Sequence, residues 1–296
     1  MTQKNYKYFA ISESDKTWGI YLLNIGSQMF APNQEYPAKD HPAHHYFQWN
    51  NGRVLQEYQL FYLLEGDGEF ESEKSGKQNI SAGQVVFLFP GVWHRYRPKK
   101  NSPWRTYWIG FDGQFARHVM DTGFVVPVRP VIDMGYHERI VRLFQEIEHI
   151  GNEEWAGYQQ IMAGLLIQLL GEIHARQRRQ PFQHSGHEDM IRHAKILFLQ
   201  TLDQSIQMDH IAGQLGMSYT LFRRLFKQYT GMSPRQYVIQ LRIEKAKDLL
   251  LDRRNNVKEV AYLVGFESNH YFTRLFKEKT GLTPTQFINQ SLKKID

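Results

Sequence analysis

The sequence contains no cysteine, which excludes a disulfide framework, a cysteine-ligated zinc site and a thiol nucleophile. It has no run of about 18 apolar residues, the length that a membrane-spanning helix requires. Its N-terminus lacks the cationic start and apolar stretch of a secretory signal, so we expect a cytoplasmic protein with no membrane partner. With 296 residues, of which 42% are hydrophobic, the chain is long enough for two folded domains.

Net charge is also missing from the first two thirds of the chain. Residues 1–186 contain 19 Lys and Arg and 19 Asp and Glu, whereas residues 187–296 contain 17 and 11. All of the net charge of +6 therefore belongs to the last third, which is where a polyanion would be attracted.

Short strands are predicted between residues 6 and 113. The segments are rich in β-branched and aromatic residues and are separated by glycine-containing turns; they are 18–23, 57–64, 68–72, 85–89 and 104–111. Strands without helices between them indicate a β-sandwich or a small barrel. Within this region, Gly83 and Pro90-Gly91 are expected to form turns around a buried strand, with His94 and Tyr96 on one face of the next strand.

A helical pattern follows from about residue 134 to 177. One helix is predicted around Ile140, Phe144 and Ile147, and a second carries an apolar strip of Ile161, Leu165, Leu169 and Ile173. Polar residues with Pro181 and Gly186 then indicate a linker. We predict a β-domain at 1–130, a helical connector at 131–178, a linker at 179–187 and a helical domain at 188–296.

The last third contains an internal repeat. Phe222-Arg-Arg-Leu-Phe-Lys recurs as Phe272-Thr-Arg-Leu-Phe-Lys, 50 positions later, and Gly216 recurs as Gly265 at an offset of 49. Each copy is read as a short helix, a tight turn and a second helix, at 208–215 and 219–229 in the first and 257–264 and 269–280 in the second. An unbroken helix at 234–251 is expected to be a rigid spacer between the copies.

The second helix of each copy has an apolar face and a basic, hydroxyl-bearing face. Such a helix suits the major groove of DNA, where arginine pairs with guanine, asparagine with adenine, and lysine neutralises phosphate. We expect two adjacent major-groove segments of double-stranded DNA, roughly 34 Å apart, to be contacted by each chain. The predicted DNA-binding residues are Ser218, Tyr219, Thr220, Arg223, Arg224, Lys227, Ser268, Asn269, His270, Thr273, Arg274 and Lys277.

Two kinds of position are distinguished within that set. Arg224 and Arg274 are the same in both copies, so they could bind a phosphate or a neighbouring carboxylate and read no base. Sequence discrimination is expected where the copies differ, which is Thr220 against His270 and Arg223 against Thr273.

The segment Gly265-Phe-Glu-Ser-Asn-His-Tyr-Phe-Thr-Arg-Leu-Phe-Lys-Glu-Lys-Thr-Gly-Leu-Thr-Pro resembles the tandem helix-turn-helix of AraC/XylS transcriptional regulators, and the match covers about 188–290. Residues 60–68, 83–96 and 103–111 resemble the cupin-like effector domain of the same family. The implied fold is multidomain α+β: a cupin-like β-barrel or sandwich with a helical connector, then an all-α tandem helix-turn-helix whose two units are joined by a long helix. The resemblance also implies a homodimer through the helical connector, and RNA polymerase as a further partner.

The resemblance implies an activator controlled by a small effector bound in the β-domain. Aromatic faces stack on sugars, so a sugar or sugar derivative and a carbohydrate-catabolic operon are our leading expectation. In sugar-sensing members the strands that match Tyr96, Thr106 and Trp108 line the effector pocket, and Arg53 matches after an adjustment of the alignment. The predicted effector-binding residues are Arg53, His94, Tyr96, Thr106 and Trp108; the alternative is that Tyr96 and Trp108 are ordinary core.

A cupin enzyme fused to a DNA-binding domain is one alternative to this function. A cupin enzyme needs an HxH pair and a Glu on one strand and a further His on a later strand, but the strand around Tyr62 carries no histidine. His41, His44 and His45 lie in a proline-flanked segment, so we expect no metal, no cofactor and no enzymatic activity. A non-sugar effector and a ligand-independent architectural DNA binder remain as alternatives.

Overall fold

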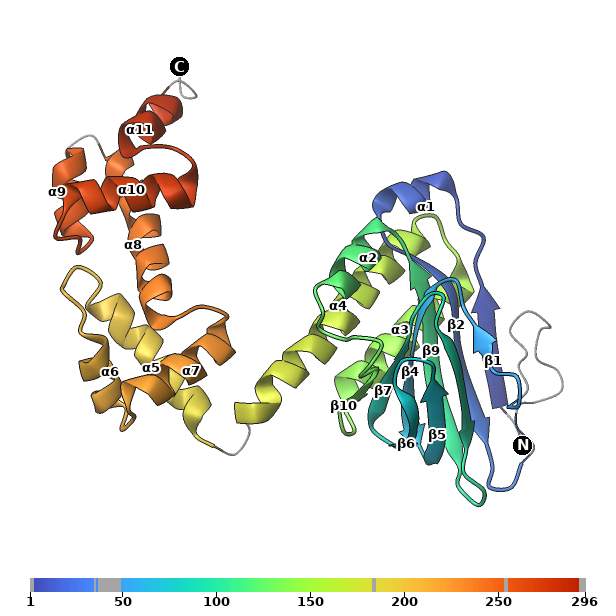
Figure 1. The fold of residues 1–296 in the computed structure, drawn as a ribbon. Coiled ribbons are helices and arrows are strands. Elements are labelled where there is room, and N and C mark those ends of the chain that lie inside the picture. Colours follow the sequence, from blue (N-terminus) through green and yellow to red (C-terminus); the bar gives the residue numbers. More distant parts are fainter. Residues whose placement is uncertain (1–2, 35, 37–48, 183–184, 253–254, 293–296) are drawn as a thin grey trace. The chain divides into compact units, whose positions relative to one another are not determined.

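The computed structural model describes residues 3–34, 36, 49–182, 185–252 and 255–292. The chain divides into two compact units, Met1–Gln177 and Arg178–Asp296 (Figure 1). Strands and helices form the first unit, and the described part of the second contains helices alone, which confirms the predicted fold class. The cluster of His41, His44 and His45 lies outside the described residues. None of the described helices has the length and hydrophobicity needed to cross a bilayer.

The N-terminal unit is a sandwich of two antiparallel sheets. The first sheet has the order β1-β2-β9-β4-β7-β10 and the second has the order β3-β8-β5-β6. The strands of the first are β1 (Gln3–Tyr8), β2 (Tyr21–Phe30), β9 (Trp104–Asp112), β4 (Tyr58–Glu65), β7 (Gln84–Leu88) and β10 (Val131–Asp133). Those of the second are β3 (Arg53–Val54), β8 (Trp93–Pro98), β5 (Asp67–Ser72) and β6 (Gly76–Ser81).

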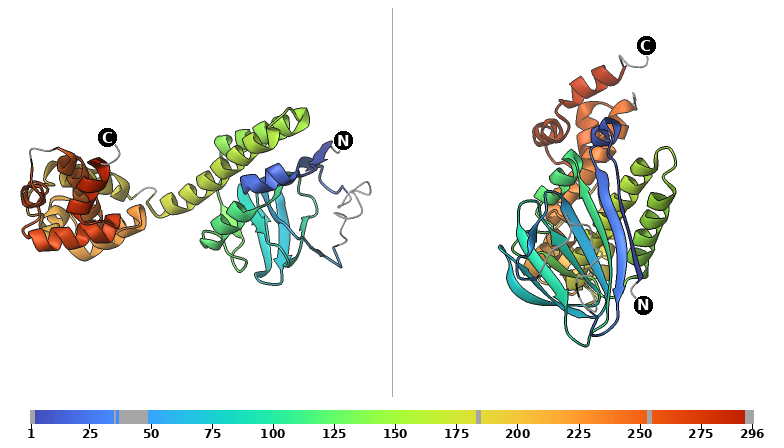
Figure 2. Two further views of the ribbon diagram at one scale, coloured as in Figure 1. Left: turned by 90° about the horizontal axis from the view of Figure 1, so that it is seen from above. Right: turned by 90° about the vertical axis from the view of Figure 1, so that its right-hand side faces the viewer.

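The two faces of the six-stranded sheet have different partners. Its outer face is covered by the helices α3 (Glu138–Glu153) and α4 (Tyr158–Arg179) (Figure 2). The rings of Tyr62 and Tyr107 stack on Phe144 of α3, with centroids 6.3 and 5.5 Å away. Phe61 alternates with Tyr62 along β4 and lies on the inner face, where it packs against Tyr96 of the other sheet at 4.6 Å. Strand alternation thus separates a helix-covered core from the sandwich interior.

One predicted strand in this unit is placed wrongly, and the predicted apolar strip of α4 is only partly buried. The strand expected at 18–23 is preceded by a helix, α1 (Glu13–Trp18), because Ser12 and Asp15 form a capping box, and β2 begins only at Tyr21. On α4, Leu169 and Ile173 of the predicted apolar strip are buried, but Ile161 is 47% exposed. A strict four-residue spacing drifts around a helix of 3.6 residues per turn. The buried stripe contains Met162, Ala163, Leu166, Leu169, Leu170 and Ile173. A further short helix, α2 (Gln114–Asp121), was not foreseen.

The C-terminal unit contains the predicted repeat of helices. They are α5 (His187–Gln200), α6 (Met208–Gln214), α7 (Tyr219–Thr230), α8 (Pro234–Leu251), α9 (Val257–Leu263), α10 (Asn269–Thr280) and α11 (Pro284–Leu292). Two separate apolar clusters form, one around α6 and α7 and one around α9 and α10. Helix α8 contributes Val238 to the first cluster and Ala246 to the second, so it is the shared element between the two helix-turn-helix units. Phe182, from the short helix Gln180–Phe182, is also buried in the first cluster.

Candidate DNA-binding surface and effector site

The second helix of each unit is built in the same way. The hydroxyl oxygen of Ser218 accepts the amide of Leu221 at 3.4 Å and so caps α7, and Ser268 caps α10 by accepting from Tyr271 at 3.3 Å. Each helix ends at a glycine in the left-handed region, Gly231 (φ 82°) and Gly281 (φ 80°). These caps fix the length of both helices at 12 residues, which equals the predicted range 269–280 for α10 and exceeds the predicted range 219–229 for α7 by one residue.

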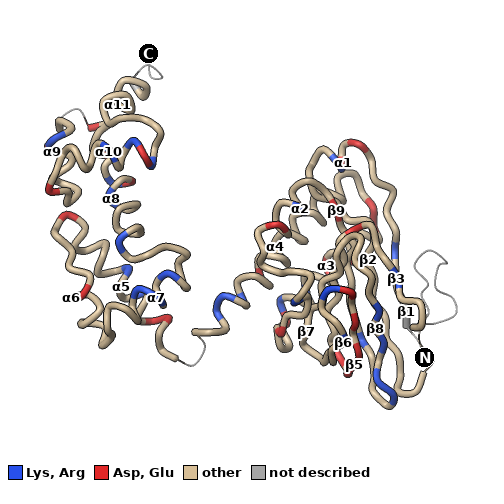
Figure 3. The backbone as a smooth tube through the Cα atoms, in the orientation of Figure 1, with Lys and Arg blue, Asp and Glu red and all other residues tan. Residues whose placement is uncertain are grey.

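Paired phenylalanines anchor the two helices. Phe222 and Phe226 are fully buried with ring centroids 5.5 Å apart, and Phe272 and Phe276 are fully buried at 5.6 Å. The rest of each helix surface is left for polar groups, and Figure 3 shows lysine and arginine on both α7 and α10. The exposed members of the predicted DNA-binding set are Ser218, Thr220, Arg223, Arg224, Lys227, Ser268, His270, Arg274 and Lys277.

The arginines shared by the two copies have no carboxylate partner among the described residues. Within the part of the chain that the structure describes, neither Arg224 nor Arg274 forms an ion pair. Arg274 instead lies over the ring of Tyr271, with 5.4 Å between the guanidinium carbon and the ring centroid. The alternative in which these arginines serve a neighbouring carboxylate therefore has no support among the described residues.

Three residues of the predicted set are less exposed than expected. Tyr219, Asn269 and Thr273 are partly buried, and the Oδ1 atom of Asn269 is enclosed without a hydrogen-bond partner among the described groups. A paired contact of the Asn269 amide with adenine therefore requires its side chain to turn outward. Asn269 is the first residue of α10, and helical spacing alone does not show that it is partly buried.

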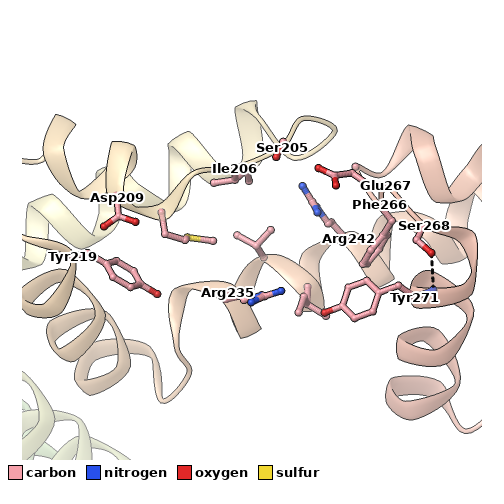
Figure 4. A pocket seen from close by; sticks show the side chains of 14 residues that line it. Ser205, Ile206, Asp209, Tyr219, Arg235, Arg242, Phe266, Glu267, Ser268 and Tyr271 are labelled. Atoms are coloured by element: carbon pink, nitrogen blue, oxygen red, sulfur yellow. Dashed lines mark hydrogen bonds between the residues drawn. The ribbon is translucent and has the colours of Figure 1, made fainter.

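A groove of about 520 Å³ separates the two helix-turn-helix units (Figure 4). Tyr219 enters it from the start of α7, Tyr271 enters it from the first turn of α10, and Arg235 and Arg242 of α8 line it between them. The lining also contains Asp209 and Glu267. The starts of both predicted recognition helices thus border one groove, whose walls belong to different copies of the repeat.

A polar group inside the sandwich centres on the partly buried Arg53 of β3 and includes three buried partners. Its Nε donates to His94 Nε2 at 3.2 Å, and its Nη2 donates to the hydroxyl of Tyr96 at 3.1 Å and to Gln59 Oε1 at 3.4 Å. His94 and Tyr96 share one face of β8, as predicted, and are 1% and 8% exposed. Three of the five predicted effector residues therefore form a single hydrogen-bonded group.

His94 is held in its neutral form. Burial, aided by the positive charge of Arg53, lowers the pKa of His94 to about 3. Its Nδ1 lies 3.0 Å from the carbonyl oxygen of Val92, so Nδ1 carries the proton and Nε2 accepts from Arg53. The imidazole is thereby a fixed acceptor near neutral pH.

Thr106 and Trp108 belong to β9 and lie on its inner face. Thr106 is 2% exposed, and Trp108 is half-buried against the apolar cluster that contains Tyr96. The indole of Trp108 occupies the space beside Gly26 of β2, where a Cβ atom would lie 2.2 Å from Trp108 Cζ2. The structure thus places all five predicted residues on the walls of one interior, although Tyr96 and Trp108 also serve as core.

Several interior polar residues were missed. Asn24, Gln28 and Gln59 are buried on strands β2 and β4, and the hydroxyl of Tyr36 is hydrogen-bonded to Gln28 and Tyr96. Burial raises the pKa of Tyr36 well above its usual value. The signal available was the recurrence of Asn24, Gly26 and Gln28 at every second position of a strand that is otherwise mostly apolar. Trp104 adds a buried Nε1 donor that has no acceptor among the described groups.

Two family models match the chain. One, described as an AraC-like ligand binding domain, matches residues 31–170, and the other, described as a helix-turn-helix domain, matches residues 211–290. This chain belongs to the AraC family of transcriptional regulators. As a member of that family it is a DNA-binding transcriptional regulator with an N-terminal ligand-binding domain.

Curated relatives of the AraC-family chain extend over most of its length. It is 22% identical to the raffinose operon transcriptional regulatory protein RafR of Pediococcus pentosaceus, over 88% of this chain and 90% of that protein. It is also 22% identical to the lactose operon transcription activator of Staphylococcus xylosus, over 74% of this chain and 78% of the relative. Among solved structures, ToxT from Vibrio cholerae O395 matches 97% of this chain and 96% of its own, with 13% identity and a TM-score of 0.31.

Proposed function

We propose that this protein activates a carbohydrate-utilisation operon, and that a sugar or sugar derivative bound inside the sandwich controls it. The observation that carries the proposal is the polar group around Arg53, which joins a guanidinium, an imidazole, an amide and the hydroxyl of Tyr96, while Trp108 packs against the apolar cluster that contains Tyr96. Sugars need hydrogen-bonding partners around their rims and an aromatic face for their apolar surface. The names of the raffinose and lactose operon regulators point to the same class of effector.

The DNA-binding residues are proposed on the exposed faces of α7 and α10. Arg223, Arg224 and Lys227 on the first helix, and His270, Arg274 and Lys277 on the second, are exposed and point to no described carboxylate. Two such helices in one chain suit two successive major-groove segments. We propose that Arg223 and His270 read bases, whereas the shared arginines contribute to both sites equally.

A thermal-shift screen tests the effector. The full chain is heated with monosaccharides, α- and β-galactosides, phosphorylated sugars and non-sugar metabolites at increasing concentration. Binding to the folded state raises the melting temperature with the logarithm of ligand concentration over its dissociation constant. Arg53→Met and Thr106→Val should abolish the shift, and Glu73→Gln, on the outside of the sandwich, is the matched control. A shift that persists in both interior variants would place the ligand elsewhere.

Binding of a sugar must also change the affinity for DNA. The effector can act only through a difference in its affinity for two arrangements of the protein. We expect the ligand identified by thermal shift to alter the dissociation constant of the selected operator at fixed salt. An unchanged constant, with unchanged transcription in vitro by RNA polymerase, would contradict effector control while leaving DNA binding intact.

A homodimer through α4 is proposed as well. Ile161 and Ile167 are 47% and 40% exposed on this helix. Gly164 and Gly171 have open space where a side chain would be, which lets another helix approach closely. Sedimentation of the full chain should give a dimer, and Ile161→Glu should shift it to the monomer; a wild-type monomer at micromolar concentration would contradict the proposal.

A further inference from the structure

Arg242, near the middle of α8, joins parts of the chain that belong to different helix-turn-helix units. Its Nε donates to the carbonyl oxygen of Leu202 at 3.0 Å, and its Nη2 donates to that of Gln204 at 2.6 Å. Both carbonyls lie in the loop that leads from α5 into α6, in the first helix-turn-helix unit. The guanidinium carbon also lies 5.5 Å from the ring centroid of Phe266, in the turn of the second unit (Figure 4).

The contact is close enough to restrict the second turn. Gly265 has a φ of +83°, and a Cβ atom there would lie 2.6 Å from Arg242 Nη2 and 2.6 Å from the carbonyl oxygen of Leu202. The corresponding turn glycine of the first unit, Gly216, has a φ of +69° and nothing within 4 Å of such an atom. A helix-turn-helix therefore does not need this contact to form, and its presence in one copy calls for another explanation.

The charge of Arg242 is retained in this half-buried place. Burial lowers the pKa of its guanidinium, and the carboxylates of Glu267 and Asp203 act in the opposite direction. Because the ordinary pKa of arginine lies far above neutrality, the group stays protonated and donates to both carbonyls. Charge-assisted hydrogen bonds of this kind are stronger than neutral ones and fix geometry.

Apart from the contacts of Arg242, the two helix-turn-helix units are joined mainly by α8. Their apolar clusters are separate, with Val238 and Leu241 of α8 in contact with the first and Ile243 and Ala246 in the second. A groove, not a packed core, lies between them. A helix attached to each unit along one side leaves the angle between them open to bending. The contacts of Arg242 supply a second attachment point across that groove.

We propose that Arg242 is a positioning residue that sets the spacing and phase of α7 and α10 on DNA. The inference rests on the proposed function, in which both helices enter successive major-groove segments roughly 34 Å apart. Adding or removing one base pair between the half-sites rotates and shifts one half-site relative to the other. A rigid pair of helices therefore binds the altered spacing less well, whereas a pair whose mutual angle can change still binds it.

The test uses the full chain and the duplex that the wild type selects from a randomised library. Binding is measured at fixed salt to this duplex, to versions with one base pair added or removed between the half-sites, and to versions with either half-site scrambled. For Arg242→Met we expect about tenfold weaker binding to the selected spacing, changes within about twofold on single half-sites, and at least about fivefold less discrimination between spacings. Arg242→Lys, which keeps one charged donor group, should restore part of the discrimination.

Lys245→Met is the matched control, because Lys245 is an exposed cation on the same helix with no hydrogen bond or ion pair among the described residues. It should leave the ratio between spacings unchanged. Circular dichroism and thermal unfolding establish that each variant is folded. Arg242→Met with unaltered spacing discrimination, or with equal losses on single and double half-sites, would overturn the positioning role. If wild-type protein binds a single half-site as tightly as the full duplex, the proposed two-site recognition itself fails.

Discussion

The two helix-turn-helix units share a scaffold and differ in their surroundings. Both have a serine cap, a C-terminal glycine and a phenylalanine pair at nearly equal separation, 5.5 and 5.6 Å. Gly216 nevertheless faces open space, whereas Gly265 is enclosed by Arg242 and Leu202. Similar local sequences thus build similar local structures, and the neighbours decide what further role an equivalent residue has.

The largest expected effect is the loss of stability when a buried phenylalanine is removed, and it shows whether the apolar cores of the two helix-turn-helix units unfold separately. Phe226→Ala and Phe276→Ala each remove a fully buried ring, so each should lower the free energy of unfolding of its own unit by about 3–5 kcal/mol. Hydrogen exchange should rise around α6 and α7 in the first variant and around α9 and α10 in the second. Equal increases in both regions from either variant would show that the cores unfold as one.

The turn glycines should differ in their tolerance of a side chain. Gly216→Ala forces alanine into the left-handed region, which is expected to reduce the unfolding free energy by about 1–2 kcal/mol. Gly265→Ala adds contacts of 2.6 Å with Arg242 and Leu202, for a further loss of about 1–3 kcal/mol. Urea unfolding of the two variants measures the difference, and equal losses would mean that the second turn is not enclosed in solution.

The surfaces of α7 and α10 should differ in what they read. Arg223→Ala should lower affinity by about 1–3 kcal/mol at one base position, because an arginine that pairs with guanine is lost. Thr273→Ala, at the equivalent place in the second unit, should cost less and at a different base position. Binding to a series of single-base variants at fixed salt tests both, and an equal loss for Arg223→Ala on every sequence would contradict base reading.

The smallest expected effect concerns the caps, where the two units should agree. Ser218→Ala and Ser268→Ala each remove a capping hydroxyl, and each should reduce stability by about 1 kcal/mol. Thermal unfolding measures this loss, and Ser→Gly at each site should lose only a few tenths of that amount. A fall in DNA affinity with unchanged stability would show that the hydroxyl contacts DNA and does not cap the helix.

The helical unit could be predicted from the sequence almost to its boundaries, and the sandwich only in outline. The predicted range 234–251 is that of α8, and the second recognition helix begins and ends as expected at Asn269 and Thr280. In the sandwich, the strand expected at residue 18 was displaced by the capping box of α1. Helix signals are local, whereas strand pairing joins residues far apart, such as Gly26 and Trp108.

Candidate site residues, too, could be predicted on the helices but only in part inside the sandwich. Exposed groups on α7 and α10 could be found from the repeat, because helical spacing sorts the surface from the buried phenylalanines. Inside the sandwich, Tyr36, Gln28 and Gln59 were missed, because their burial depends on which strands face each other. His94 was identified as a candidate, but its lowered pKa is caused mainly by its burial in the sandwich, aided by the charge of Arg53, 41 residues earlier in the chain.

The sequence by itself determined the two-part organisation, the duplicated helix-turn-helix and the capped lengths of its helices, because these follow from spacing, capping and charge within a few residues. Only the tertiary structure decided that the polar groups of β2, β3, β4, β8 and β9 share one interior and that Arg242 connects the two units. Both depend on contacts between distant segments. Such contacts are fixed by the burial of apolar surface across the whole fold and leave no local pattern.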